Sequence, residues 1–167
     1  NINKYRTGII TVLKKMGANI SIINKRFDSN EEIGDLIIKS SQLKPLNIGG
    51  EIISTLIDEL PILFIACAVS SGISKISGIE ELRYKESDRI KSMEEGLNAV
   101  GIKARSTIDS IEINGGEILG GKINSYGDHR IAMAFAIAAL ISKKSITIID
   151  TKNISTSFPN FIDLMRE

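Results

Sequence analysis

The sequence predicts an α/β (α+β) domain whose helices are buried and covered by sheets. Two features support this prediction. The 167 residues contain the same succession of helix, strands, helix and strand twice, which indicates two duplicated supersecondary units at about 1–85 and 86–167. Residues 60–69 and 131–140 are apolar on every side, and helices of this kind are usually buried all round.

The first unit opens with a predicted amphipathic helix that Gly17 ends. Its expected elements are a helix over 7–16, strands over 20–23 and 36–38, an apolar helix over 60–69 and a strand over 73–76. Asp58 precedes the apolar helix, and Pro61 stands in its first turn, where proline is tolerated. A long loop is expected between Arg26 and Gly50, because the offset between the two units shortens across this region.

The second unit repeats this order. Its expected elements are a helix over 88–99, strands over 110–113 and 117–123, an apolar helix from Asp128 through Leu140 and a strand over 145–149. Gly101 ends the first helix as Gly17 does in the first unit. The pairs Gly115-Gly116 and Gly120-Gly121 are interpreted as hairpin turns, because neither has the context of a phosphate-binding loop.

Composition is that of an ordinary soluble domain. The chain has 43% hydrophobic residues and a formal net charge of +1, with no block of like charge that would favour nucleic acid or a membrane surface. Its longest apolar run is far short of the roughly 20 residues that a membrane-spanning helix needs. A single cysteine and no recognisable signal peptide predict a cytoplasmic location. The start at Asn1 rather than Met fits a piece of a longer protein.

Acidic and arginine side chains gather at three predicted helix starts. They are Asp58, Glu86, Asp88, Arg89, Asp128, His129 and Arg130. Asp58 and Asp128, at corresponding places, can each be read as an N-cap, and Ser87 or Asp88 can cap the helix between them. Arg89 and Arg130 lie in first turns, where positive charge opposes the helix dipole, so anion binding explains them better than helix stabilisation. The alternative for Glu86 is an ordinary surface carboxylate.

Other kinds of site are not supported. His129 is the only histidine and has no Cys or His companions at zinc-ligand spacing. No G-x-S-x-G turn is present, so a hydrolase triad is not predicted. Cys67 is interpreted as a small buried side chain of an apolar helix. We therefore expect neither a metal nor a cofactor, and the residues alone predict an anion site without naming the anion.

Five motifs occur in order along the chain. They are R-T-G at 6–8 with V-L-K-K-M-G at 12–17, I-D-E-L-P at 57–61, E-E-L-R-Y-K-E-S-D-R at 80–89, D-H-R-I-A-M at 128–133 and T-S-F-P at 156–159. Together they resemble the signatures of the EPSP synthases, the 3-phosphoshikimate 1-carboxyvinyltransferases. The resemblance implies an inside-out domain with two βαβαββ-type repeats, in which buried parallel helices are covered by mixed sheets.

The resemblance also implies a reaction. EPSP synthases transfer the enolpyruvyl group of phosphoenolpyruvate to the 5-hydroxyl of shikimate 3-phosphate, in the pathway to aromatic amino acids. Asp58 would then accept the hydroxyl proton, and Glu86 would donate and shuttle a proton. The implied substrate-binding residues are Lys85 for shikimate 3-phosphate, Arg89 and Arg130 for phosphoenolpyruvate, and Asp128 and His129 beside them without a firm role.

The chain departs from the family pattern in two ways. It resembles roughly the last two-fifths of a member, so the N-terminal domain would be a missing partner and the chain alone would be inactive or nearly so. An exposed sheet edge or apolar patch is expected in the first unit, which lacks a leading strand. Thr156 stands where many members have a substrate-binding lysine, although a branch with A-T-S-F-P is similar.

Two alternative functions accompany this interpretation. One is an isolated, non-catalytic folding or binding domain. The other is the related enolpyruvyl transferase that acts on UDP-N-acetylglucosamine, against which the K-E-S-D-R and D-H-R motifs argue.

Overall fold

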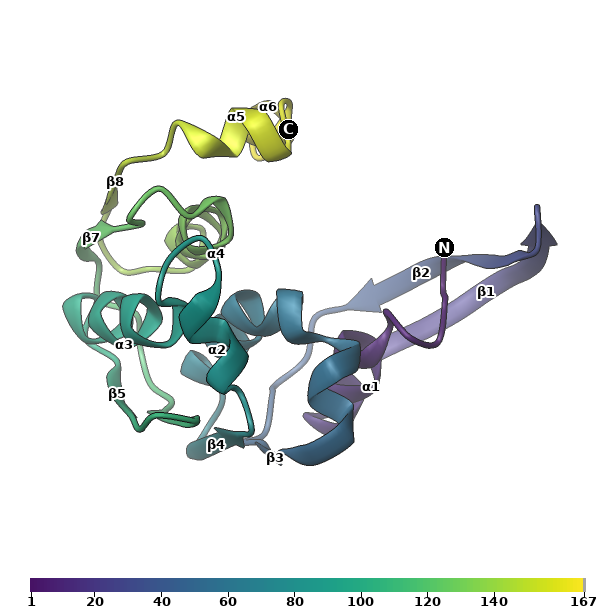
Figure 1. Ribbon diagram of the computed structural model, residues 1–167, viewed down its shortest axis with the longest axis horizontal. Coiled ribbons are helices and arrows are strands. Elements are labelled where there is room, and N and C mark those ends of the chain that lie inside the picture. Colours follow the sequence, from purple (N-terminus) through teal and green to yellow (C-terminus); the bar gives the residue numbers. More distant parts are fainter. Residues whose placement is uncertain (167) are drawn as a thin grey trace.

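A computed structural model describes residues 1–166 (Figure 1). The α-helices are α1 (Gly8–Lys15), α2 (Leu60–Ala68), α3 (Arg89–Ala99), α4 (His129–Ala139), α5 (Asn153–Ser157) and α6 (Phe161–Leu164). The strands are β1 (Asn19–Asp28), β2 (Glu31–Lys39), β3 (Asn47–Ile48), β4 (Ile73–Ser77), β5 (Lys103–Ser106), β6 (Ser110–Asn114), β7 (Gly121–Asn124) and β8 (Ile146–Ile149). Short 3-10 helices are η1 (Gly50–Thr55), η2 (Ile57–Glu59) and η3 (Glu80–Tyr84).

The order of elements in residues 8–77 recurs in residues 89–149. In each stretch a helix precedes an antiparallel pair, β1–β2 or β5–β6. A single strand, a second helix and a strand parallel to the first then follow, as β3–α2–β4 or β7–α4–β8. Both stretches contribute to one four-stranded sheet of order β3-β4-β6-β5, in which β4 runs antiparallel to β6. This shared sheet joins the two stretches.

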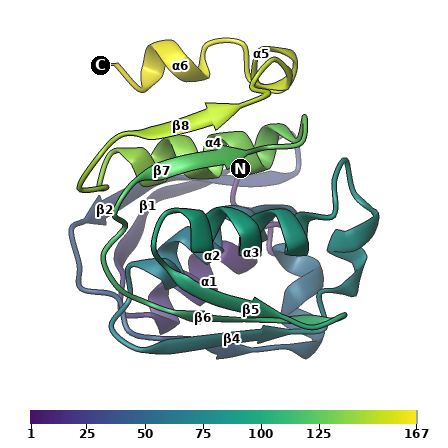
Figure 2. The ribbon, with the colours of Figure 1, turned by 90° about the vertical axis from the view of Figure 1, so that its left-hand side faces the viewer.

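The central helices lie between sheets. Figure 2 shows α2 and α3 against the sheet of β4, β6 and β5, with β7 and β8 on the other side, next to α4. α3 contacts both β5 and β7, while α2 contacts β6 and α4. Their buried side chains form one cluster that includes Phe64, Ile90, Ile113 and Phe135. Removing this apolar surface from water is the main source of the fold's stability.

α2 and α4 are not buried on every side, which corrects the expectation from their composition. Ile62 of α2 and Met133 and Ile137 of α4 are only half-buried. With Phe158 and Phe161 from the C-terminal segment, they line a groove of about 230 Å³. Residues 1–166 therefore leave part of the apolar surface of α2 and α4 exposed, although the composition of these helices predicts that it is buried.

The region between Arg26 and Gly50 was expected to be a loop, but much of it is a strand hairpin. β1 continues to Asp28 and β2 begins at Glu31. The hairpin extends away from the rest of the domain (Figure 1). Apolar side chains on it are uncovered within the described chain, since Phe27 is 78% and Ile38 66% exposed. Individual apolar side chains of the first unit are thus exposed on this hairpin.

The glycine pairs of the second unit are not hairpin turns. β6 ends at Asn114 and β7 begins only at Gly121, and the two strands belong to different sheets. A Cβ atom on Gly115 would lie 1.9 Å from the carbonyl oxygen of Ser70, so this glycine lets the chain pass against the end of α2. The strand predicted over 117–123 is reduced to β7, and β5 has no counterpart among the predicted strands.

Candidate active site

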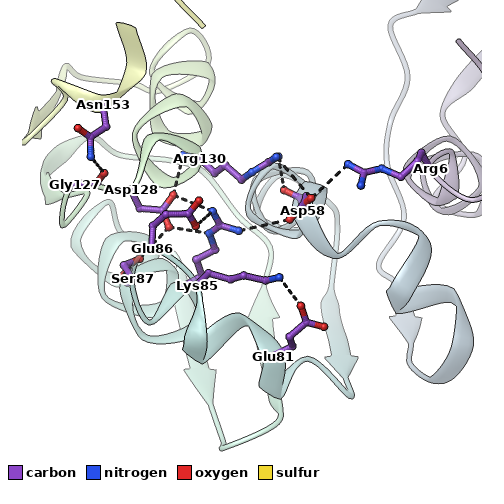
Figure 3. Close-up of polar contacts among 12 residues, drawn as sticks. Arg6, Asp58, Glu81, Lys85, Glu86, Ser87, Gly127, Asp128, Arg130 and Asn153 are labelled. Atoms are coloured by element: carbon purple, nitrogen blue, oxygen red, sulfur yellow. Dashed lines mark hydrogen bonds and ion pairs between the residues drawn. The ribbon is translucent and has the colours of Figure 1, made fainter. Parts of the chain in front are cut away.

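Asp58, Glu86, Arg89 and Arg130 come from distant parts of the sequence and lie together in the structure. Figure 3 shows Asp58, Glu86 and Arg130 of this group. Asp58 lies in η2, immediately before α2, and Glu86 lies in the loop between η3 and α3. Arg89 is the first residue of α3, and Arg130 is the second residue of α4. Because α2, α3 and α4 pack against one another, their N-terminal ends meet at one polar cluster.

Arg89 is at the centre of this cluster and is only 1% exposed. Its Nε donates to Oδ2 of Asp128 at 2.7 Å, and its Nη2 hydrogen-bonds to Glu86. Its Nη1 lies 3.8 Å from Oδ1 of Asp58. A buried guanidinium needs such compensation, because an unpaired charge in the interior is strongly destabilising. Arg89 therefore connects three carboxylates.

Asp128 is fully buried and has several donors. Besides Arg89, its carboxylate accepts from the backbone N–H of Arg130 at 2.9 Å and from the Ser87 hydroxyl at 3.2 Å. Asp128 is therefore the N-cap of α4, as one interpretation of the sequence predicted. Any contribution of this carboxylate to ligand binding would act through Arg89, which it orients.

Asp58 differs from Asp128 because it caps no helix. The residue at the N-cap of α2 is Glu59, and no side chain caps that helix. The Asp58 carboxylate is 25% exposed and is flanked by Nη2 of Arg6 at 3.4 Å and Nη2 of Arg130 at 3.8 Å. Arg130 also donates to the backbone carbonyl of Asp58 at 2.9 Å. Three guanidinium groups, with Arg89, thus surround a carboxylate that is open to solvent.

Lys85 and Glu86 lie side by side on the loop that leads into α3. Lys85 hydrogen-bonds to Glu81 through Nζ, and its side chain is largely buried. Glu86 is 51% exposed and uses one carboxylate oxygen to pair with Arg89. Asp88, rather than Ser87, caps α3 by accepting from the N–H of Lys91 at 3.0 Å. The half-exposed Glu86 is therefore held by one partner and accessible to solvent.

His129 and Thr156 lie at the margin. His129 begins α4 beside Asp128 and is half-buried, and no hydrogen bond or ion pair of its side chain is found within residues 1–166. Thr156 lies in the exposed helix α5. In the same segment, Phe158 reaches the groove that Asp58 and Arg130 line at its polar end.

Two arginines to which the sequence analysis assigned no role, Arg6 and Arg83, lie near this cluster, and Arg83 pairs with Asp88 at the start of α3 at 2.7 Å. Arg6 pairs with Asp58 and approaches Glu59 to 3.9 Å. A Cβ atom on Gly8 would lie 2.1 Å from Oγ1 of Thr55, so glycine lets α1 begin close to η1 and brings Arg6 near Asp58. The available signal for Arg6 was its place in the R-T-G motif, and for Arg83 its place in the run of residues 80–89.

Two side chains away from this cluster have altered pKa values. Burial raises the pKa of the Cys67 thiol to about 11, and a hydrogen bond with Ser74 opposes the shift. The Tyr126 hydroxyl donates to Glu95 at 2.7 Å, and that carboxylate raises the pKa of Tyr126. Neither group contacts the cluster around Arg89.

Residues 1–166 contain no group of three His, Cys, Asp or Glu side chains with the geometry to hold a metal ion. The helices in that range are also too short or too polar to cross a membrane.

Comparison with known proteins shows which family the chain is similar to. A sequence profile of EPSP synthase (3-phosphoshikimate 1-carboxyvinyltransferase) matches residues 1–165. The chain belongs to the EPSP synthase family. The family indicated by the five motifs is thus confirmed, and the match favours it over the UDP-N-acetylglucosamine transferase considered from the sequence.

Individual EPSP synthases match along nearly all of the chain. The 3-phosphoshikimate 1-carboxyvinyltransferase of Legionella pneumophila (strain Paris) is 48% identical over 161 residues, which are 96% of this chain and 37% of that protein. The enzyme of Alkaliphilus metalliredigens is 48% identical over 166 residues, covering 99% of this chain and 39% of that protein. The solved EPSP synthase of Acinetobacter baumannii superposes with a TM-score of 0.95 at 43% identity, covering 99% of this chain and 39% of that one. The chain therefore spans less than two-fifths of these relatives.

Proposed function

We propose that this chain is the C-terminal portion of an EPSP synthase and contributes one wall of its active site. Together with the remaining portion, it transfers the enolpyruvyl group of phosphoenolpyruvate to shikimate 3-phosphate. The observation that carries the proposal is the convergence of Asp58, Glu86, Arg89 and Arg130 in a chain of this family. Two acids and two guanidinium groups suit a reaction that moves protons between strongly anionic substrates.

The two acids divide the proton transfers. In the addition step, Asp58 accepts the proton of the 5-hydroxyl as its oxygen bonds to C2 of phosphoenolpyruvate, and Glu86 gives a proton to the methylene carbon. In the elimination step, the new methyl group returns a proton to Glu86, the bond from C2 to the phosphate oxygen breaks, and Asp58 protonates the departing phosphate. Both acids thereby regain their starting states. Their common neighbour Arg89 keeps them within reach of one ligand.

The guanidinium groups hold the anions. Arg130 is 31% exposed and its Nη2 lies 3.8 Å from Asp58, longer than a hydrogen bond, so this fork has capacity for a ligand carboxylate or phosphate. Arg89 binds Asp128 through Nε, while its Nη2 faces Glu86 and its Nη1 faces Asp58. Lys85, next to Glu86 and 24% exposed, contacts shikimate 3-phosphate by exchanging Glu81 for the ligand. Fixed positive charge of this kind stabilises the charged intermediate.

The remaining portion of the enzyme is the proposed partner. It would cover the exposed hairpin β1–β2 and the groove between α2 and α4, where apolar side chains are in contact with water. The recurrence of element order supports duplicated units at about 1–85 and 86–167 within an inside-out domain. A cytoplasmic location stays a prediction from the single cysteine.

A graft tests this function. This chain would replace the matching 161 residues of the Legionella pneumophila relative, a protein that we call the grafted enzyme. With phosphoenolpyruvate and shikimate 3-phosphate, the grafted enzyme should release phosphate, whereas the purified chain should release none. Glu86→Gln and Arg130→Ala in the grafted enzyme should abolish most of that release, and Lys122→Ala at an exposed position of β7 should not.

Two results would contradict the proposal. Robust turnover by the chain alone would show that the site is not shared with a second domain. A grafted enzyme that folds and stays inactive would favour the isolated, non-catalytic domain.

A further inference from the structure

The loop that carries Lys85 and Glu86 is fixed at both ends by one side chain. Arg83, the fourth residue of η3, directs Nη1 to Oδ2 of Asp88 at 2.7 Å. Its Nε donates to the carbonyl oxygen of Ile108 at 2.7 Å, and its Nη2 donates to the carbonyl oxygen of Thr107. The Arg83 side chain is only 21% exposed. The guanidinium of Arg83, at the start of the loop, thus binds both Asp88, at the end of the loop, and the turn between β5 and β6.

The turn that receives Arg83 is itself well anchored. The N–H of Thr107 donates to the carbonyl of Ser110 at 2.9 Å, and the Thr107 hydroxyl donates to Asp109 at 2.9 Å. The carbonyl of Asp109 accepts from the N–H of Ile79, just before η3, at 3.0 Å. Because β5 and β6 belong to the four-stranded sheet, this anchor connects the loop to the sheet that joins the two stretches.

Asp88 transmits the constraint to α3. Its Oδ1 caps the helix through Lys91, and its Oδ2 pairs with Arg83. The first residue of that helix is Arg89, which pairs with Glu86. Within the loop, Tyr84 is 84% exposed, while Lys85 binds Glu81, Glu86 pairs with Arg89 and Ser87 donates to Asp128. Arg83 adds the connection from the loop to the turn between β5 and β6.

We propose that Arg83 is a positioning residue for Lys85 and Glu86, acting through its planar fork rather than its charge alone. This inference rests on the proposed function for its catalytic consequence. Arg83 makes no hydrogen bond or ion pair with Asp58, Glu86 or Arg130 within the described residues, so it acts through the loop. A guanidinium donates in three directions at fixed angles, whereas a lysine ammonium on a flexible chain does not reproduce that geometry.

The test uses the grafted enzyme with Arg83→Lys and Arg83→Gln, and Arg105→Gln at an exposed position of β5 as the matched control. Because small displacements of catalytic groups cost about 10²-fold in rate, both Arg83 variants should lower kcat roughly 10- to 100-fold. Their KM for phosphoenolpyruvate should stay within about threefold, since Arg130 is untouched. Hydrogen exchange of residues 84–88 should accelerate while exchange elsewhere is unchanged.

A second variant keeps the inference testable if Arg83 proves essential for folding. Asp88→Asn preserves a helix cap, because Asn caps as well as Asp, but removes the charged partner of Arg83. It should accelerate exchange of the same loop, and its effect on kcat should not add to that of Arg83→Gln. Full activity of Arg83→Lys, unchanged loop exchange in the variants, or exchange that rises throughout the protein would overturn the positioning role. If the unmutated grafted enzyme lacks activity, the proposed function fails, and loop exchange alone still decides whether Arg83 holds the loop.

Discussion

Asp58 and Asp128 stand at corresponding places before the two apolar helices, and the structure uses them differently. Asp128 has no exposed surface, caps α4 and binds the guanidinium of Arg89. Asp58 caps nothing, is partly exposed and faces three guanidinium groups at distances of 3.4–3.8 Å. One carboxylate is occupied by structural hydrogen bonds, while the other remains accessible at a cleft.

The difference shows how duplicated supersecondary structure can provide both a support and a reactive group. Capping consumes the acceptor capacity of a carboxylate, whereas an uncapped acid beside cations keeps acceptor capacity for a ligand. In the proposed reaction, the buried Asp128 positions Arg89 and the accessible Asp58 exchanges a proton. The following predictions test this division.

Removing the carboxylate of Asp128 should have the largest effect on stability. Asp128→Ala leaves the buried Arg89 paired with Glu86 and 3.8 Å from Asp58, and breaking a buried ion pair typically costs about 3–5 kcal/mol. Asp58→Ala removes ion pairs at 3.4–3.8 Å from a carboxylate that is 25% exposed, and it leaves Arg89 paired with Asp128 and Glu86, so it should cost at most about 1 kcal/mol. Urea unfolding of the purified variants, followed by circular dichroism, measures both, and equal losses would contradict the division.

The two helix starts should also differ in capping energy. Asp88→Ala removes the cap of α3 together with the ion pair to Arg83 and should lower the free energy of unfolding by about 1–2 kcal/mol. Glu59→Ala, at the uncapped start of α2, should have no measurable effect on stability. The same unfolding experiment decides, and a substantial loss from Glu59→Ala would mean that the start of α2 depends on a side chain.

Cys67 lies near the C-terminal end of α2 and belongs to the buried core, so its reactivity reports on core packing. Its thiol, with a pKa raised to about 11, stays protonated as the pH rises through 9, so at pH 8 only about one molecule in a thousand carries a thiolate. Labelling by a disulfide reagent at pH 8 should therefore be slow in the native protein and should speed up as the pH nears 11. Asp128→Ala should accelerate labelling at pH 8 by loosening the core, and Asp58→Asn should leave the rate unchanged. Rapid labelling of the unmutated chain would show that Cys67 is not buried.

Helices were largely predictable from the sequence because their signals are local. The apolar faces and end signals of residues 7–16 and 88–99 place α1 and α3 nearly where the structure has them. The strand β5 was not predicted because its sequence, Lys-Ala-Arg-Ser, has no β-branched residue. It forms a strand by pairing with β6. The glycine pairs were wrongly predicted to form hairpin turns for a similar reason. Gly115 is needed where the chain packs closely against the end of α2, and that contact is visible only in the tertiary structure.

The residues of the candidate site were predictable from the sequence, but which of them are buried or cap a helix was not. Residue type and position nominated Asp58, Glu86, Arg89 and Arg130, and the resemblance assigned their roles, which stay predictions. No local pattern separates the capping Asp128 from the uncapped Asp58, because burial and the approach of Arg89 depend on how the helices pack. Arg6 was missed for the same reason, as it reaches Asp58 from another element.

The most direct test of the division is phosphate release by the grafted enzyme carrying Asp58→Asn. Loss of a positioned general base typically lowers rates by about 10²–10⁴-fold, and we expect a fall of that size with an unchanged midpoint of thermal unfolding. Activity close to that of the unmutated grafted enzyme would contradict the role of Asp58. A loss of activity that only follows a loss of folding would mean that Asp58, like Asp128, is a structural residue.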